Sequence, residues 1–137
     1  MALSAVGALA ALTGKAWVLG SFGATCVLLF GFPAAPFSRP RNVFGGHMLS
    51  SAIGLASLHA LGPGWMAMAA AGACALMVML VTDTVHPPAG SNPVIVYLYQ
   101  PGWDFLVLPT LAGVCVVVLT ARLYRLALFR RSAPAPR

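Results

Sequence analysis

The chain alternates long apolar blocks with short polar or proline-rich stretches, and this pattern predicts a set of helices. Six apolar blocks stand out, at residues 2–12, 17–31, 43–61, 65–82, 93–99 and 103–123. A helix that crosses a bilayer needs about 20 apolar residues, a length that the third, fourth and sixth blocks approach. Block 93–99 is about half a span, and the first two blocks are short unless they form one helix broken near Gly14–Lys15. The pattern predicts an all-α bundle of four or more spanning helices with half-helices between them.

Turn sequences separate the blocks and fix how neighbouring helices connect. The sequence "LGPGW" at Leu61–Trp65 is typical of a tight turn, so blocks 43–61 and 65–82 are predicted to form an antiparallel hairpin. The stretch Gly31–Asn42 contains three prolines and cannot be helical throughout. We expect residues 1–131 to form a single transmembrane domain, followed by a short disordered tail at 132–137.

The stretch Asp83–Gln100, "DTVHPPAGSNPVIVYLYQ", gathers polar residues and helix breakers in an otherwise apolar chain. Asn92–Pro93 is typical of the first positions of a helix, which predicts a half-helix from Pro93 to about Tyr99. Pro87 and Pro88 favour extended or turning backbone before it. Such backbone is tolerated at membrane depth only where it is buried in protein or lines a cavity. Transporters and channels use this kind of broken element for binding.

A similar pattern occurs earlier in the chain. "GATCVLLF" at Gly23–Phe30 resembles "AGSNPVIV" at Ala89–Val96, and each is followed by a proline-containing turn and a full span. This predicts two repeats of helix, half-helix and helix, although chance resemblance is the alternative. If residues 83–100 cross the membrane, Arg39 and Arg41 lie on the same side as the C-terminal arginines. We favour crossing over re-entry because the positive-inside rule prefers that arrangement.

Composition supports a lipid environment for most of the chain. Of the 137 residues, 60% are hydrophobic and 7% are charged, whereas soluble domains have about a quarter charged residues. The net charge of +6 comes largely from the C-terminal arginines, so we expect a cytoplasmic tail and no nucleic-acid partner. The three cysteines lack a CxxC spacing, and no nucleophile–base or metal-ligand motif is found. We therefore expect no enzyme activity, no metal and no cofactor.

Longer motifs resemble a known family. "TDTVHPPAGSNPVIVYL" and "GSFGATCVLLFGFPAAPFSRPRNVFGGHMLSS", with their spacing, are similar to the HPP family of integral membrane proteins over about Val18 to Leu123. This chain has "SFGATC" where the family commonly has "GASA", and Ser38–Arg39 where Ala–Gln is common. The family has about four spans and occurs in bacteria, algae and chloroplasts, and plastid members are associated with nitrite transport. The resemblance implies a multi-pass protein of a bacterial inner membrane that moves nitrite or another small anion.

Helix N-termini attract anions, because their amide groups are free and carry partial positive charge. One such end is expected at the Pro93 helix and a second near Ser21–Gly23. The residues predicted to bind the substrate are His86, Gly90, Ser91, Asn92, Ser21, Gly23, Thr25, Arg41 and His47. Those with a structural role in the turn are Pro87, Pro88, Pro93 and Asp83, the last through an ion pair with Arg41.

Several of these roles have alternatives. His86 either contacts the anion, exchanges a proton during transport, or only fixes the turn. Arg41 either attracts anions or binds lipid phosphate. His47 either lines a path with Ser51 or forms hydrogen bonds between helices. Asn42 and Asn92 are expected to cap helices.

Two functions from different classes follow. The first is a transporter or channel for a small anion, with nitrite favoured. The second is a non-transporting structural or assembly subunit of a membrane complex. The small residues Ala67, Ala71 and Ala75 favour helix association, and they also fit a homo-oligomer, either a dimer or a trimer, within the lipid bilayer.

Overall fold

The computed structural model describes residues 2–13 and 20–132, and this part of the chain is helical throughout apart from its turns. The main helices are α1 (Ala2–Thr13), α2 (Gly20–Cys26), α3 (Pro40–Leu61), α4 (Trp65–Val81), α5 (Asn92–Tyr99) and α6 (Ala112–Ser132). Shorter helical turns join them: η1 (Val27–Gly31), η2 (Pro36–Ser38), η3 (Pro87–Ser91), η4 (Trp103–Leu106) and η5 (Val107–Leu111). The all-α class is confirmed, and the elements follow the six apolar blocks.

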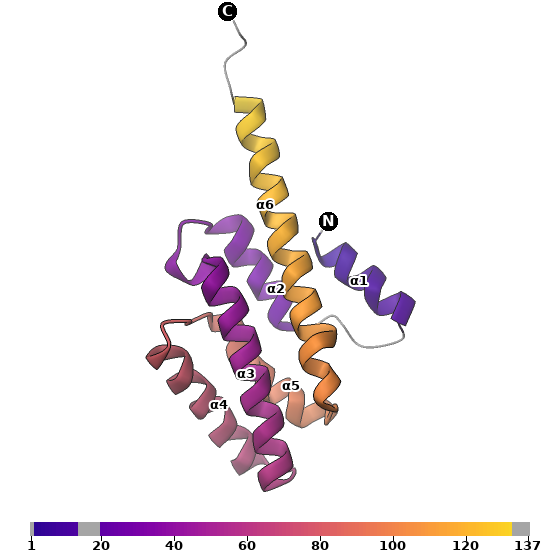
Figure 1. Ribbon diagram of the computed structural model, residues 1–137, viewed down its shortest axis with the longest axis vertical. Coiled ribbons are helices and arrows are strands. Elements are labelled where there is room, and N and C mark those ends of the chain that lie inside the picture. The colour runs from indigo at the N-terminus through magenta and orange to yellow at the C-terminus, as the bar shows by residue number, and fades with distance from the viewer. Residues whose placement is uncertain (1, 14–19, 133–137) are drawn as a thin grey trace, which may run out of the picture.

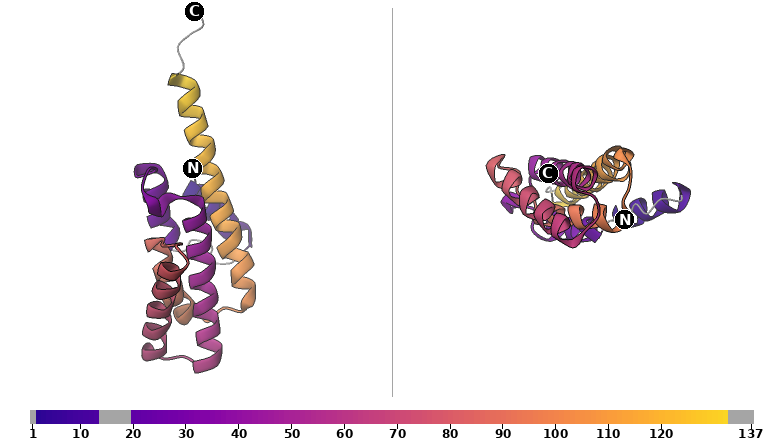
Figure 2. Two further views of the ribbon diagram at one scale, coloured as in Figure 1. Left: turned by 60° about the vertical axis from the view of Figure 1, so that its left-hand side comes forward. Right: turned by 90° about the horizontal axis from the view of Figure 1, so that it is seen from below.

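The helices alternate in direction along the bundle. In Figure 1, α2 runs upward and α3 downward, whereas α5 runs downward and α6 upward. Figure 2 shows α3 and α6 side by side, with α4 on the opposite side of α3 from α6. The element order therefore fits the predicted pair of helix, half-helix, helix units, and the second unit has the reverse orientation of the first.

The segment between α4 and α6 carries the chain from one end of the bundle to the other. In Figure 1, α4 rises from the turn at Leu61–Trp65, α5 descends, and α6 rises again. The C-terminal end of α6 thus points toward the end of the bundle where α3 begins. That residues 83–100 cross the membrane stays a prediction.

Both half-helices are interrupted helical runs. The α2 helix passes into a wide π turn, η1. The chain after it is held by Ser38, whose hydroxyl donates to the Phe32 carbonyl oxygen at 2.8 Å and has the Leu28 carbonyl oxygen as a second acceptor at 3.1 Å. The α5 helix continues directly from the 3-10 turn η3. Prolines at the first positions of η3 start that turn, because proline tolerates a position whose amide group would be unpaired.

Some helix boundaries and caps differ from the sequence-based prediction. Helix α5 begins at Asn92 instead of Pro93, and α3 begins at Pro40, so Asn42 lies inside it. Neither helix has a side-chain cap, so the prediction that Asn42 and Asn92 act as caps is wrong. Both amide side chains donate to residues of other elements instead. The expected break near Gly14–Lys15 and most of the expected tail lie outside the described residues.

The outer surface is strongly apolar. Large hydrophobic side chains are exposed along α4 and α6, including Met77, Leu80, Val81, Leu119 and Leu123. By length and hydropathy, one described helical stretch, Trp103–Leu128, qualifies as a membrane span. The shorter helix α4 is apolar as well, but α3 has polar residues on the face that it turns to its neighbours.

Candidate functional site

The two half-helices meet against α3 in the centre of the bundle. Thr25 comes from α2, His47 from α3, and Asn92 from α5, while His86 precedes η3. All four residues are fully buried, with 0% of their surface exposed. A cluster of polar side chains this deep in an apolar chain requires internal hydrogen-bond partners, since each unpaired group is costly away from water.

Glycines on α3 allow the HPP turn to lie directly on the helix. A Cβ atom added at Gly46 would come within 2.7 Å of the His86 Cβ, and one added at Gly54 within 2.9 Å of the Pro93 Cα. At Gly45 it would meet the Thr84 side chain at 2.7 Å. The turn and the start of α5 therefore pack closely against α3 at these three glycines. These contacts place the imidazole of His86 beside that of His47.

His86 connects the turn to two other segments. Its Nδ1 lies 2.8 Å from the carbonyl oxygen of Phe37, and its Nε2 lies 2.9 Å from the Thr25 hydroxyl. A carbonyl oxygen only accepts hydrogen bonds, so Nδ1 carries a proton. In the neutral imidazole, Nε2 is then the acceptor and the Thr25 hydroxyl donates to it.

His47 continues the chain of hydrogen bonds on the other side of Thr25. Its Nε2 lies 3.0 Å from the Thr25 hydroxyl and its Nδ1 lies 3.0 Å from Nδ2 of Asn92. The Asn92 Nδ2 also donates to the His47 carbonyl oxygen at 3.3 Å and to the Ser51 hydroxyl at 2.9 Å. Ser51 lies 3.3 Å from the hydroxyl of Thr110 in η5.

The partners of Asn92 fix the direction of these bonds. Because Nδ2 only donates, the His47 Nδ1 accepts, and the neutral ring carries its proton on Nε2. That N–H donates to Thr25. The bonds therefore all point one way, from Asn92 through His47, Thr25 and His86 to Phe37. We call this chain of four side chains the polar wire.

The wire predicts different tautomers for the two buried histidines. In protein labelled with ¹⁵N in its imidazoles, we expect His47 to be protonated on Nε2 and His86 on Nδ1, which NMR chemical shifts of the four nitrogens distinguish. The third histidine, His59, has its Nδ1 2.8 Å from the Leu55 carbonyl oxygen and serves as an Nδ1–H reference. Detection of His47 as an Nδ1–H tautomer would contradict the assigned direction.

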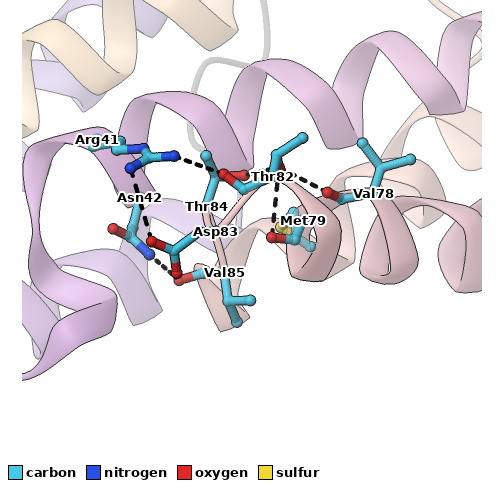
Figure 3. A network of polar contacts seen from close by, with 8 residues as sticks. All are labelled: Arg41, Asn42, Val78, Met79, Thr82, Asp83, Thr84 and Val85. Atoms are coloured by element: carbon cyan, nitrogen blue, oxygen red, sulfur yellow. Dashed lines mark hydrogen bonds and ion pairs between the residues drawn. The ribbon is translucent and has the colours of Figure 1, made fainter.

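The outer end of the turn is held by a separate set of contacts (Figure 3). Nη2 of Arg41 donates to the Thr82 carbonyl oxygen at 2.8 Å, and Nη1 lies 3.7 Å from the Asp83 carboxylate. Asn42 donates to the Val85 carbonyl oxygen at 3.0 Å. The predicted Arg41–Asp83 pair is confirmed, but both side chains are exposed, so the pair contributes little stability. Asn42 fixes the residue directly before His86.

The other residues predicted to bind substrate lie around the wire or apart from it. Ser21 is buried, and its carbonyl oxygen lies 2.8 Å from the Thr25 hydroxyl, as a second possible acceptor for its proton. A Cβ atom added at Gly23 or Gly90 would have no neighbouring atom within 4 Å, so no other described part of the chain packs closely against these two glycines. The hydroxyl of Ser91 donates to the Pro88 carbonyl oxygen at 2.9 Å, which stabilises the turn. Arg41 lies at the surface and does not contact the wire.

The backbone at the start of α5 differs from the anion site that was expected at this helix N-terminus. The Ala89 amide donates to the His86 carbonyl oxygen, and the Asn92 amide donates to the Ala89 carbonyl oxygen. Prolines 87, 88 and 93 have no amide hydrogen. The prediction of free amide groups at the Pro93 helix start is therefore wrong at these positions, because η3 continues into α5.

Two buried polar atoms have no partner among the described residues of this region. They are the Ser21 hydroxyl and the Oδ1 atom of Asn92. Each belongs to a residue next to the wire or in it. Unpaired buried polar atoms are uncommon and call for an explanation, such as an ion or a water molecule in the functional state.

Sequence reasoning missed two parts of the site. The Phe37 carbonyl oxygen could not be identified, because a backbone acceptor has no signature in the residue type. Thr110 lies in η5, beyond the apolar half of α5, and no local pattern links it to Ser51. The nearby Phe22 ring packs on His47, with ring centroids 5.3 Å apart.

Comparison with known proteins agrees with this architecture. The model of the HPP transmembrane region matches residues 1–134. Two proteins of Dictyostelium discoideum, each described as a transmembrane protein, are both 32% identical to the chain: one over 85% of the chain and 44% of the relative, the other over 77% and 36%. The chain thus spans less than half the length of these curated relatives. No solved structure matches it. The family match and the sequence identities show that this chain belongs to the HPP family of transmembrane proteins.

Proposed function

We propose that the protein is a membrane transporter or channel for a small anion, with nitrite as the favoured substrate. The observation that carries this proposal is the polar wire, which joins the two half-helices at the junction of two oppositely directed units. In transporters built from inverted repeats, substrates bind near the bilayer midplane, where discontinuous helices from the two repeats meet.

The chemistry of the site favours a small, weakly held ligand. The wire contains hydroxyl, imidazole and amide groups, and no charged side chain is part of it among the described residues. Neutral N–H and O–H donors leave the empty site without a permanent buried cation, which would be costly at membrane depth. A site of moderate strength also lets the ion leave, as conduction requires. The unpaired Ser21 hydroxyl supplies a further donor beside the wire.

The choice of nitrite depends on the family. Plastid members of the HPP family are associated with nitrite transport, and the motifs that carry the resemblance include the residues of the wire. The geometry itself favours a small monovalent anion and does not distinguish nitrite from nitrate or formate. Competition between these ions in one flux assay would rank them.

The proposal is tested by anion flux in liposomes that contain the purified protein. We expect nitrite uptake well above that of protein-free liposomes, and a loss of about tenfold or more in the variant His86→Ala, since its two hydrogen bonds end. The matched control is His59→Ala, which lies outside the wire and should keep its flux. Uptake by His86→Ala equal to that of the wild type would rule out this site.

One argument for the alternative, a non-transporting subunit, was the small-residue face of α4, which could pack against a partner. Ala71 and Ala75, at the centre of the small-residue face of α4, are buried within the chain, where α4 packs against α3 and α5. This face is therefore occupied by the chain's own helices. If the wild-type protein moves no anion in any condition, the subunit function is favoured instead.

A further inference from the structure

The Thr25 hydroxyl has one proton and two acceptors within hydrogen-bond distance. The Ser21 carbonyl oxygen lies at 2.8 Å and Nε2 of His86 at 2.9 Å. Since one O–H makes one strong hydrogen bond, it donates either to the carbonyl or to the imidazole. Donation to the imidazole requires a bare Nε2, and donation to the carbonyl leaves the hydroxyl oxygen free to accept.

The two positions of this proton correspond to two protonation states of His86. When His86 is neutral, Thr25 donates to Nε2. When His86 binds a second proton at Nε2, that N–H donates to the Thr25 oxygen, and the hydroxyl proton turns to the Ser21 carbonyl oxygen. Both states keep the bonds of His86 to Phe37 and Thr25 and the bond from His47, since a hydroxyl oxygen has two acceptor sites.

His47 has no comparable second state. Its Nδ1 faces the Nδ2 group of Asn92, which only donates. A proton added at Nδ1 would therefore point at another donor. Of the two buried histidines, His86 is the one whose surroundings accept an added proton without breaking a hydrogen bond.

Among the described residues, none of the groups that contact His86 carries a full charge, so a proton bound by His86 is the positive charge available to balance an anion in the site. The hydroxyl of Thr25 and the Ser21 carbonyl come from α2, the Phe37 carbonyl from η2, and His47 from α3, with its ring centroid 5.1 Å away. Asp83 and Arg41 pair with each other at the exposed surface. A bare anion in this site would be a buried, unpaired charge, which is strongly disfavoured.

We propose that His86 takes up one proton at Nε2 with each anion that enters the site, and that Thr25 acts as the switch between the two states. The anion then crosses with one proton, and transport is electroneutral. The lone pair on Nε2 forms the new N–H bond on proton uptake and is regenerated on release, so no other reactant is needed. This inference rests on the proposed anion transport and specifies its coupling.

The wild-type protein in liposomes provides the first test. With the membrane potential set by potassium and valinomycin, the initial rate of nitrite uptake, corrected for protein-free liposomes, should not change with potential. A pH gradient of about one unit should drive about tenfold accumulation. By contrast, a potential of about 100 mV shifts the distribution of an uncoupled monovalent anion about fiftyfold.

The outcomes separate the two proposals. Uptake that follows the potential and ignores the pH gradient overturns proton coupling and leaves anion transport standing. The absence of protein-dependent flux in every condition overturns both. Electroneutral, pH-driven uptake supports both.

Variants of Thr25 test the switch itself. Thr25→Val keeps the shape of the side chain and removes the hydroxyl, so we expect pH-driven accumulation to fall about tenfold, to the level of protein-free liposomes. Thr25→Ser restores the hydroxyl and should restore accumulation. The matched control is Thr120→Val on α6, where the hydroxyl donates to the Val116 carbonyl oxygen at 2.7 Å and lies outside the wire. Full pH-driven accumulation by Thr25→Val would overturn the role of Thr25. If that variant does not fold, the potential and pH-gradient measurements on the wild type decide the coupling.

Discussion

Replacing Gly46 with alanine is expected to destabilise the folded protein by about 1–3 kcal/mol, the usual cost of overpacking a close contact. The added methyl group would lie 2.7 Å from the His86 Cβ and 3.2 Å from the Thr84 carbonyl oxygen. The backbone oxygen cannot rotate away as the end of a long side chain would, so the turn itself must move. Thermal unfolding in detergent, followed by size-exclusion chromatography, measures the loss.

Gly72→Ala on α4 is the matched control for this substitution. No atom lies within 4 Å of a Cβ added at Gly72, so the same change in the middle of a helix meets open space. Because alanine is the better helix former by about 1 kcal/mol, Gly72→Ala should be neutral or stabilising. Equal melting temperatures for the two variants would show that the HPP turn does not lie against α3.

The second large effect is expected for Asn92→Leu, which keeps the size of the side chain but removes its amide. The Ser51 hydroxyl and the carbonyl and Nδ1 of His47 then lose their donor, and buried polar groups without a partner cost about 1–3 kcal/mol. We expect a total loss of about 2–4 kcal/mol, since not every acceptor stays unpaired. Nitrite flux should fall with it, because His47 is no longer fixed in one tautomer.

The corresponding control is Asn42→Leu, which removes a single hydrogen bond, to the Val85 carbonyl oxygen. A lone hydrogen bond between membrane helices is worth about 0.6 kcal/mol on average. The stability of Asn42→Leu should therefore lie much closer to that of the wild type. An equal loss of unfolding free energy in both asparagine variants would show that the hydrogen bonds of Asn92 stabilise the protein no more than the single bond of Asn42.

The helices could be predicted from the sequence because their signals are local. Apolar blocks, proline positions and the turn at Leu61–Trp65 each act over a few residues, and the observed elements follow them. The caps could not be predicted in the same way. Asn92 has the right position for a cap, but its amide donates to Ser51 and His47, which lie 41 and 45 residues away in sequence. Tertiary contacts of this kind override a local preference.

The candidate site was only partly visible for the same reason. His86, His47, Asn92 and Thr25 stand out as polar residues in apolar surroundings, and the structure brings these four together. The same stretches of sequence also contain residues that do not join the wire. Ser91 bonds within the turn, Arg41 lies at the surface, and Gly90 has no close neighbour among the described residues. Sequence distance alone does not separate these two groups, because the direction of each side chain depends on how η3 lies on α3.

The short length of α5 also has a consequence for how the protein is made. Its eight residues span about 12 Å, far less than the bilayer core of about 30 Å, so the segment cannot insert as an independent span. It needs Gly54 against Pro93 and the Ser57 hydroxyl 2.9 Å from that of Tyr97, and both partners are on α3. Because α3 precedes α5 in the chain, α3 is synthesised before the segment that packs on it. Biosynthetic order and packing order therefore coincide, and circular permutation that places α5 ahead of α3 should impair membrane insertion.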